Sequence, residues 1–186
     1  DPGGGGDYLV RVEPDLIRNG NVAGPLTSDV PADARDVRRV KIFVSDTWPA
    51  GVDRLVVRHK VSIIQLLPES YKARMEKIPG VDLAVHQTWF GGVYQDPKNF
   101  FMQTPVVPAE FLAVHPELLL PPAQLQAWQN TRTGAIVGRN TANRFHFKIG
   151  DKIPLHSPIW GQKTWEFDLV GIYDGRAKGT DTTPLF

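Results

Sequence analysis

The sequence contains no cysteine among its 186 residues. Disulfide scaffolds, thiol nucleophiles and thiolate metal sites are therefore excluded. It also has no run that approaches the ~20 consecutive apolar residues of a transmembrane helix. Neither sign of charge is in marked excess, because 21 basic and 20 acidic residues leave a formal net charge of +1. That balance gives no indication of a nucleic-acid partner or an anionic membrane surface.

The common sequence signatures of catalytic and cofactor sites are missing as well. No serine lies in a G-x-S-x-G pattern, and no glycine cluster forms G-x-G-x-x-G or a phosphate-binding P-loop. Two histidines, His59 and His86, could share a metal if their strands were neighbours, but no acidic residue lies beside them at ligand spacing. We therefore expect the chain to have no catalytic residue, no cofactor and no metal site. The five histidines are expected to be isolated imidazoles; they are His59, His86, His115, His146 and His156.

One pair of carboxylates is a candidate for general acid–base chemistry. Glu166 and Asp168 lie two residues apart on an expected strand, so both side chains point to the same face. Glycosidases need two such acids in one cleft. The same spacing describes the solvent face of a strand whose other face carries Trp165, Phe167 and Leu169. The second interpretation accounts for every residue of the strand, and we favour it over an enzyme.

What the sequence does contain is enough apolar material for a folded core, at 41% hydrophobic and 22% charged residues. Hydrophobic periodicity predicts a strand over residues 54–61, a helix over 68–78 and a strand over 81–89. Pro79-Gly80 ends the helix. This strand–helix–strand unit is typical of an α+β fold with a mixed sheet and short helices, of the split βαβ kind.

A second pattern occupies residues 133–174. A short apolar run, Ala135-Ile136-Val137, precedes a helix that Asn140 or Thr141 can cap. A Gly150-Asp151 turn and two strands with alternating apolar residues follow. These features predict a smaller, mostly β subdomain.

The remaining stretches complete the expected organisation. Residues 1–50 read as a poorly defined leader or linker. They contain a glycine run over 3–6, candidate strands over 8–12 and 40–44, and a polar loop over 19–39. Residues 51–186 read as one core domain, in which an α/β part over about 51–130 precedes a β-rich part over about 131–175. A strand over 100–107 and helices over 109–114 and 122–128 belong to the first part.

Aromatic residues gather around Gly91-Gly92, where a tight bend is possible. They could form an exposed loop for a partner or an apolar substrate, or a satellite core beneath the loop, and we favour core packing. If a contact surface exists, we expect it to comprise Trp89, Phe90, Tyr94 and Phe101, with Trp160 of a hairpin tip second.

Several motifs together resemble a known family. They are DRLVV at 53–57, IPGV at 78–81, WFGGVY at 89–94, DPKNFF at 96–101 and the series GAIVGR, KIGD and VGIYD between residues 134 and 174. As a set they resemble the MacB-like periplasmic core domain of ABC transporter permeases, the macrolide-exporter and FtsX-type group. The resemblance covers residues 51–186.

The resemblance implies an extracytoplasmic domain on the periplasmic side of a bacterial inner membrane. Such a domain relays nucleotide-driven motion of membrane helices to substrates or partner proteins, and a separate ABC ATPase subunit hydrolyses ATP. The implied partners are that ATPase subunit, the membrane helices of the parent permease, and a second permease copy or a periplasmic protein. We accordingly expect a piece of a longer protein, truncated at its C-terminus. A free-standing extracytoplasmic module that binds a ligand or peptide is the alternative.

Overall fold

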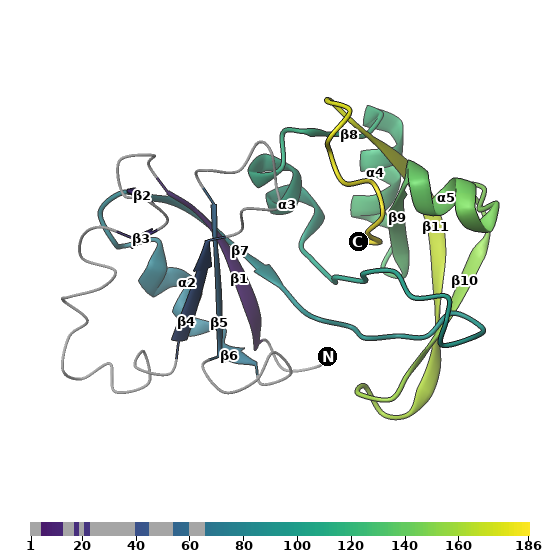
Figure 1. Ribbon diagram of the computed structural model, residues 1–186, viewed down its shortest axis with the longest axis horizontal. Coiled ribbons are helices and arrows are strands. Elements are labelled where there is room, and N and C mark those ends of the chain that lie inside the picture. Colours follow the sequence, from purple (N-terminus) through teal and green to yellow (C-terminus); the bar gives the residue numbers. More distant parts are fainter. Residues whose placement is uncertain (1–4, 13–16, 19–20, 23–39, 45–53, 60–65) are drawn as a thin grey trace. The chain divides into compact units, whose positions relative to one another are not determined.

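The structure, a computed structural model, describes residues 5–12, 17–18, 21–22, 40–44, 54–59 and 66–186 (Figure 1). The chain forms two compact units, Asp1–Trp89 and Phe90–Phe186. The division falls between residues 89 and 90, whereas the sequence suggested boundaries near residues 50 and 130. Most of the polar loop expected over 19–39 lies outside the described residues, apart from one strand of the short β2–β3 hairpin (Ile17–Arg18 and Asn21–Val22).

In the described residues of the first unit, the main sheet has five strands. Its members are β1 (Gly5–Val12), β4 (Val40–Val44), β5 (Arg54–His59), β6 (Leu67–Pro68) and β7 (Val81–Gln87), with helix α2 (Ser70–Met75) before β7. Strand β1 pairs antiparallel with β5 and with β7, and Tyr8 lies opposite Val57 on one side and His86 on the other. Strand β4 pairs antiparallel with β5.

This pairing makes β5 and β7 parallel to each other, with β1 inserted between them. It is a split βαβ arrangement, and the predicted α+β class with a mixed sheet and short helices is confirmed. The inserted strand comes from residues 5–12, which the sequence analysis had placed in a leader. Its position also separates the strands of His59 and His86, which are therefore not neighbours as a shared metal site would need.

The core of the first unit lies between α2 and the sheet. Tyr71 and Met75 are four residues apart on α2, so they share one face of the helix, and both are buried. They belong to a cluster with Tyr8 and Leu55. The hydroxyl of Tyr8 donates to the carbonyl oxygen of Pro68 (3.2 Å), and burial raises the pKa of Tyr8 to about 12.

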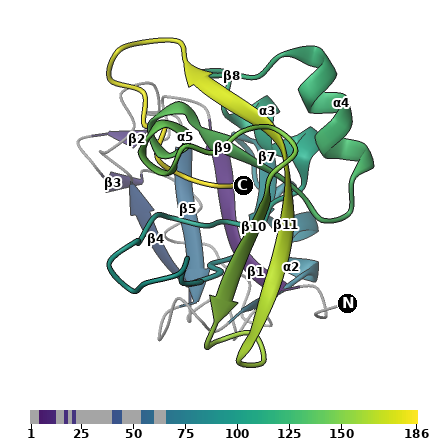
Figure 2. The same ribbon diagram turned by 90° about the vertical axis from the view of Figure 1, so that its right-hand side faces the viewer.

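The second unit contains a four-stranded sheet and three short helices. They are β8 (Leu118–Leu119), β9 (Gly134–Gly138), β10 (Lys152–Ser157), β11 (Lys163–Gly175), α3 (Pro108–Val114), α4 (Pro122–Asn130) and α5 (Arg139–Phe145). Strands β10 and β11 form the long antiparallel hairpin seen in Figure 2. Strand β9 runs parallel to β11, and β8 pairs antiparallel with the end of β11.

The last residues of the chain extend this sheet beyond β9. The backbones of Ile136 and Phe186 exchange two hydrogen bonds, of 2.8 and 2.9 Å. On the other side of the same segment, Leu185 N–H donates to Met102 and Thr104 N–H donates to Leu185, both at 2.9 Å. The strand expected over residues 100–107 is present only as this short pairing.

Two further contacts close the sheet on itself. Phe90 N–H donates to the carbonyl of Gln103 (3.2 Å), and Val93 and His156 of β10 exchange hydrogen bonds of 2.8 and 2.9 Å. Backbone pairing therefore runs without interruption from β10 through β11, β9, residues 184–186, residues 102–104 and residues 90–93 back to β10. The ring is closed by a few hydrogen bonds only, and, of the described strands, β10 alone pairs with β11 between residues 163 and 167.

Helix α5 begins differently from the prediction. Its N-cap position is Gly138, and no side chain caps it, so the expected cap by Asn140 or Thr141 is wrong. The hydroxyl of Thr141 donates instead to the carbonyl of Thr183 (2.6 Å), which ties the helix to the segment that follows β11. Among the described residues, no helix has the length and apolar character needed to span a membrane.

Candidate functional site

The predicted contact residues lie mainly in the core of the second unit. Phe90 and Phe101 are only 6% and 4% exposed, so neither side chain presents a surface to a partner. Tyr94 and Trp160 are half-buried and pack against the same core. Trp89 is half-buried and belongs to the first unit. Contact with a partner or substrate stays a prediction for these residues, and Phe90, although buried, lines the pocket described below.

Four of the aromatic rings form one cluster under α5. The ring of Tyr94 lies 5.3 Å from that of Phe145, 5.2 Å from that of Phe147 and 6.3 Å from that of Phe101. Most of these pairs meet edge to face, which is the favoured geometry. The structure brings Tyr94 and Phe101 together and fills the ring of strands at this end, as core packing would require.

The two carboxylates singled out on β11 have different surroundings. Glu166 is exposed, whereas Asp168 accepts hydrogen bonds from Lys152 Nζ (2.8 Å) and Thr133 Oγ1 (2.6 Å). The bonds from Lys152 and Thr133 hold the pKa of Asp168 below its ordinary value. On the other face, Leu169 is buried, in keeping with the half-buried strand preferred from the sequence.

One buried ionisable pair was not predicted. His115 Nδ1 lies 2.8 Å from Glu117 Oε1, and both side chains are less than 10% exposed. The imidazole also lies 4.4 Å from the ring of Phe111. Within the part of the chain that the structure describes, no group of three histidine or acidic side chains could hold a metal ion.

The motif region of residues 134–174 is interlocked by polar contacts and by glycines. The guanidinium of Arg139 donates two hydrogen bonds, both 2.9 Å, to the carboxylate of Asp174. This pairing lowers the pKa of Asp174 and raises that of Arg139. Gly171 lies where a Cβ would come within 2.8 Å of Ile136, so α4 and β9 can approach β11 closely only at a glycine.

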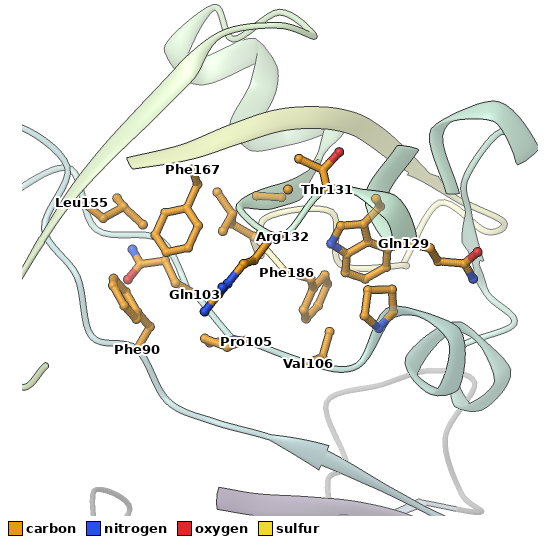
Figure 3. Close-up of a pocket in the computed structure, with 15 residues that line it drawn as sticks. Phe90, Gln103, Pro105, Val106, Gln129, Thr131, Arg132, Leu155, Phe167 and Phe186 are labelled. Atoms are coloured by element: carbon orange, nitrogen blue, oxygen red, sulfur yellow. The ribbon is translucent and has the colours of Figure 1, made fainter. Parts of the chain in front are cut away.

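A pocket of about 300 Å³ opens in the second unit (Figure 3). Its walls come from the ring, from α4 and from the segment before α3. Most are apolar, with five large side chains among them: Phe90, Trp128, Leu155, Phe167 and Phe186. The volume is at the lower end of the range of ~300–1,000 Å³ typical of ligand sites.

Polar groups in the pocket are few, and one of them is charged. Gln103 is buried, and its carboxamide is occupied by hydrogen bonds to Gly92 N and Phe101 O, both 2.7 Å. In Figure 3 the Arg132 side chain extends across the pocket, with its guanidinium towards Phe90 and Pro105. No hydrogen bond or ion pair joins that guanidinium to any residue that the structure describes.

Sequence reasoning did not find this pocket. Its lining comes from segments that are up to 96 positions apart, since Phe90 and Phe186 both contribute. Arg132 stands between two threonines in a turn after α4, where an arginine is unremarkable. Only the apolar side chains gathered around it in space distinguish it from an ordinary surface cation.

Comparisons with known proteins include a distant structural likeness. No family model matches the sequence, and no curated protein matches it. A solved structure, a domain of a candidate permease protein from Porphyromonas gingivalis, is similar at a TM-score of 0.38 and 20% identity. The alignment covers 55% of this chain and 47% of that one, so it spans less than half of the other chain's length. A likeness at this level carries no functional argument by itself.

Proposed function

We propose that this chain is the extracytoplasmic domain of an ABC transporter permease of the MacB-like type. In this role it relays nucleotide-driven movement of membrane helices to a substrate or a partner protein. The proposal starts from the sequence motifs that resemble that family. The observation that carries it is structural, since the motif residues between 134 and 174 form one interlocked body.

A relay has to move as a rigid body, because a soft domain would absorb the displacement that it should transmit. Three features of the second unit favour stiffness. The ring of backbone hydrogen bonds is closed, two hydrogen bonds join Arg139 to Asp174, and the backbone of Thr182 lies directly against Gly138. The last two use glycine, arginine and aspartate positions of the motif series itself.

The proposal assigns no catalysis to this chain. ATP hydrolysis belongs to a separate ABC ATPase subunit, and further contacts are made with membrane helices and a second permease copy or a periplasmic protein. The surroundings of Asp168 fit the solvent face of a half-buried strand, because its carboxylate accepts hydrogen bonds from Lys152 and Thr133. A free-standing ligand-binding module is the second candidate, and the pocket around Arg132 is the observation that favours it.

The complete coding sequence gives the first test. We expect one apolar segment of spanning length before the region of this chain and three after it, with an ATPase gene adjacent. Flanking sequence that encodes only further water-soluble protein would refute the proposal.

Accessibility of a single cysteine gives a test of location, and the absence of native cysteine in this chain makes it clean. In the complete protein, with any other cysteine replaced, Lys98→Cys places a thiol at an exposed position. A membrane-impermeant maleimide should label it in intact cells whose outer membrane has been permeabilised. Ser157→Cys is the matched control, because Ser157 is 0% exposed and should be labelled only after denaturation. Labelling of Lys98→Cys only after cell lysis would place the domain in the cytoplasm and refute the proposal.

A further inference from the structure

We propose that the pocket of the second unit binds a small monocarboxylate with an apolar chain, and that Arg132 holds its carboxylate. The site is built from residues of this unit alone. The inference goes beyond the relay function and does not depend on it.

The shape and the lining of the pocket select an apolar body. Aromatic and aliphatic side chains dominate the walls, and Figure 3 shows Phe167 and Leu155 of the β10–β11 hairpin on the side opposite Phe186. Trp128 of α4 also lines the pocket. Water in such a pocket makes few hydrogen bonds, so an apolar group that displaces it gains free energy. A volume of about 300 Å³ admits a short chain or a single ring system and excludes a folded peptide.

The positive charge of Arg132 favours a ligand with a negatively charged group. Arg132 is the charged residue of the described lining, which includes no aspartate or glutamate. A guanidinium matches a carboxylate through two parallel N–H···O bonds, and it needs no rearrangement of an existing ion pair to do so here. Arg132 is exposed and no described residue occupies its donors, so a bound carboxylate would replace water as their acceptor.

The number of charges limits the ligand further. A single guanidinium balances a single negative charge, and the other polar groups of the described lining are neutral: Gln103, Gln129 and Thr131. A second negative charge would lie against apolar walls without a partner, which is costly. A cationic amphiphile would meet Arg132 with like charge. The class that fits is therefore a monocarboxylate, with a neutral amphiphile of the same length expected to bind more weakly.

Direct binding of decanoate to the 186-residue chain tests the inference. Isothermal titration and tryptophan fluorescence, in which Trp128 is the reporter in the pocket wall, measure its affinity below the micellar concentration. We expect saturable binding of one decanoate per chain. Decanol should bind at least about tenfold more weakly, which corresponds to ~1.4 kcal/mol, and decyltrimethylammonium should bind more weakly still. No binding of decanoate up to its solubility limit would overturn the inference, and so would equal affinity for the three probes.

Three variants separate the charge from the cavity. Arg132→Gln should weaken decanoate at least about tenfold while leaving decanol unchanged. Arg176→Gln is the matched control, because Arg176 is an exposed arginine of the same unit outside the pocket, and it should bind as the wild type does. Val106→Trp, at a half-buried lining position in a loop, should fill the pocket and abolish binding of both decanoate and decanol.

Thermal unfolding followed by circular dichroism confirms that each variant is folded before binding is measured. Unchanged decanoate affinity in Arg132→Gln would refute the role of Arg132. Unchanged affinity in folded Val106→Trp would show that the probe binds elsewhere, and would overturn the site. The cysteine-labelling experiment tests only the location of the domain. The binding experiments and the labelling experiment can therefore refute the two proposals independently.

Discussion

Substitution of Gly138 by alanine tests how tightly the end of the chain is fixed against β9. Gly138 ends β9 and precedes α5, and its backbone is extended at φ −71° and ψ 152°, which alanine adopts freely. The cost of Gly138→Ala is therefore steric. A Cβ at this position would overlap the carbonyl carbon and oxygen of Thr182, and a backbone obstacle cannot rotate away as a side chain can.

The magnitude follows from the two ways in which the structure can respond. If the segment after residue 181 stays in place, overpacking costs ~1–3 kcal/mol. If it moves away, hydrogen bonds from Gly138 N to Pro184 O (3.0 Å), from Asn140 N to Thr182 O (3.2 Å) and from Thr141 Oγ1 to Thr183 O (2.6 Å) are lost.

Three such bonds are worth ~0.5–1.5 kcal/mol each, so release costs no less than strain. The lower entropy of the unfolded alanine chain returns ~0.4–1 kcal/mol. We expect a net loss of ~1–2 kcal/mol in the free energy of unfolding, which lowers Tm by roughly 5–15 °C for a unit of about 100 residues.

Denaturant and thermal unfolding of the variant, followed by circular dichroism, measure this loss. Gly150→Ala is the comparison, because Gly150 has φ +98° and open space around it, so the same substitution there meets only the backbone penalty. That penalty is ~1–2 kcal/mol for a residue in the left-handed region. The m-value shows which response occurs in Gly138→Ala, since release of the terminal segment enlarges the native surface and lowers m, whereas a strained segment that stays in place leaves m unchanged, as Gly150→Ala does. A Gly138→Ala variant with wild-type Tm and wild-type m-value would refute the steric reasoning.

Three further outcomes can be checked by unfolding measurements. Phe101→Ala should lower the free energy of unfolding by ~3–5 kcal/mol, because Phe101 is 4% exposed. Phe100→Ala next to it should lower it by less than ~0.5 kcal/mol, because Phe100 is 54% exposed, and equal losses would contradict the assigned core. Burial raises the pKa of Tyr173 above the ordinary value of 10.0, so its contribution to stability is constant below pH 10 and falls as the pH rises further, by up to ~1.4 kcal/mol per pH unit. Tyr173→Phe should reduce that alkaline slope in pH-dependent unfolding, and an unchanged slope would contradict the assignment. Asp174→Asn should cost at most ~1 kcal/mol, and less in 0.5 M salt, because the carboxylate and Arg139 are about half exposed; a larger loss that is insensitive to salt would show that the pair matters beyond charge.

Local periodicity was enough to predict the elements of the first unit but not their assembly. The expected strand over 54–61, helix over 68–78 and strand over 81–89 correspond to β5, α2 and β7, because alternation and helical spacing are properties of neighbouring residues. The partner that completes the split βαβ unit, β1, lies more than 40 positions before β5. Glycines at its start suggested a linker, and in the structure Gly5 and Gly6 pair with Pro68 and Leu67. Long-range pairing overrides that local preference.

The helix α5 shows a second limit of reasoning from single positions. A threonine near the start of a helix is a good candidate for a cap, since its hydroxyl oxygen can accept a hydrogen bond from an N–H of the first turn. Thr141 instead donates to the carbonyl of Thr183, 42 positions away along the chain. Thr141 is only 3% exposed, so water cannot easily reach its hydroxyl. The carbonyl of Thr183 is the hydrogen-bond partner that water would otherwise be, and the hydroxyl does not cap the helix.

The surroundings of the aromatic residues and of Arg132 could not be predicted from the sequence, because they depend on segments far apart in the chain. Phe90 and Phe101 drew attention as contact residues because large apolar side chains in a glycine-containing loop suggest a surface for recognition. In the structure, however, both residues belong to the close-packed core of the second unit. Arg132 was not predicted as a site residue, yet the turn after α4 places its guanidinium across a pocket whose walls are mostly apolar. Residues that are far apart in the sequence thus bury Phe90 and Phe101, and they place apolar side chains beside an exposed arginine.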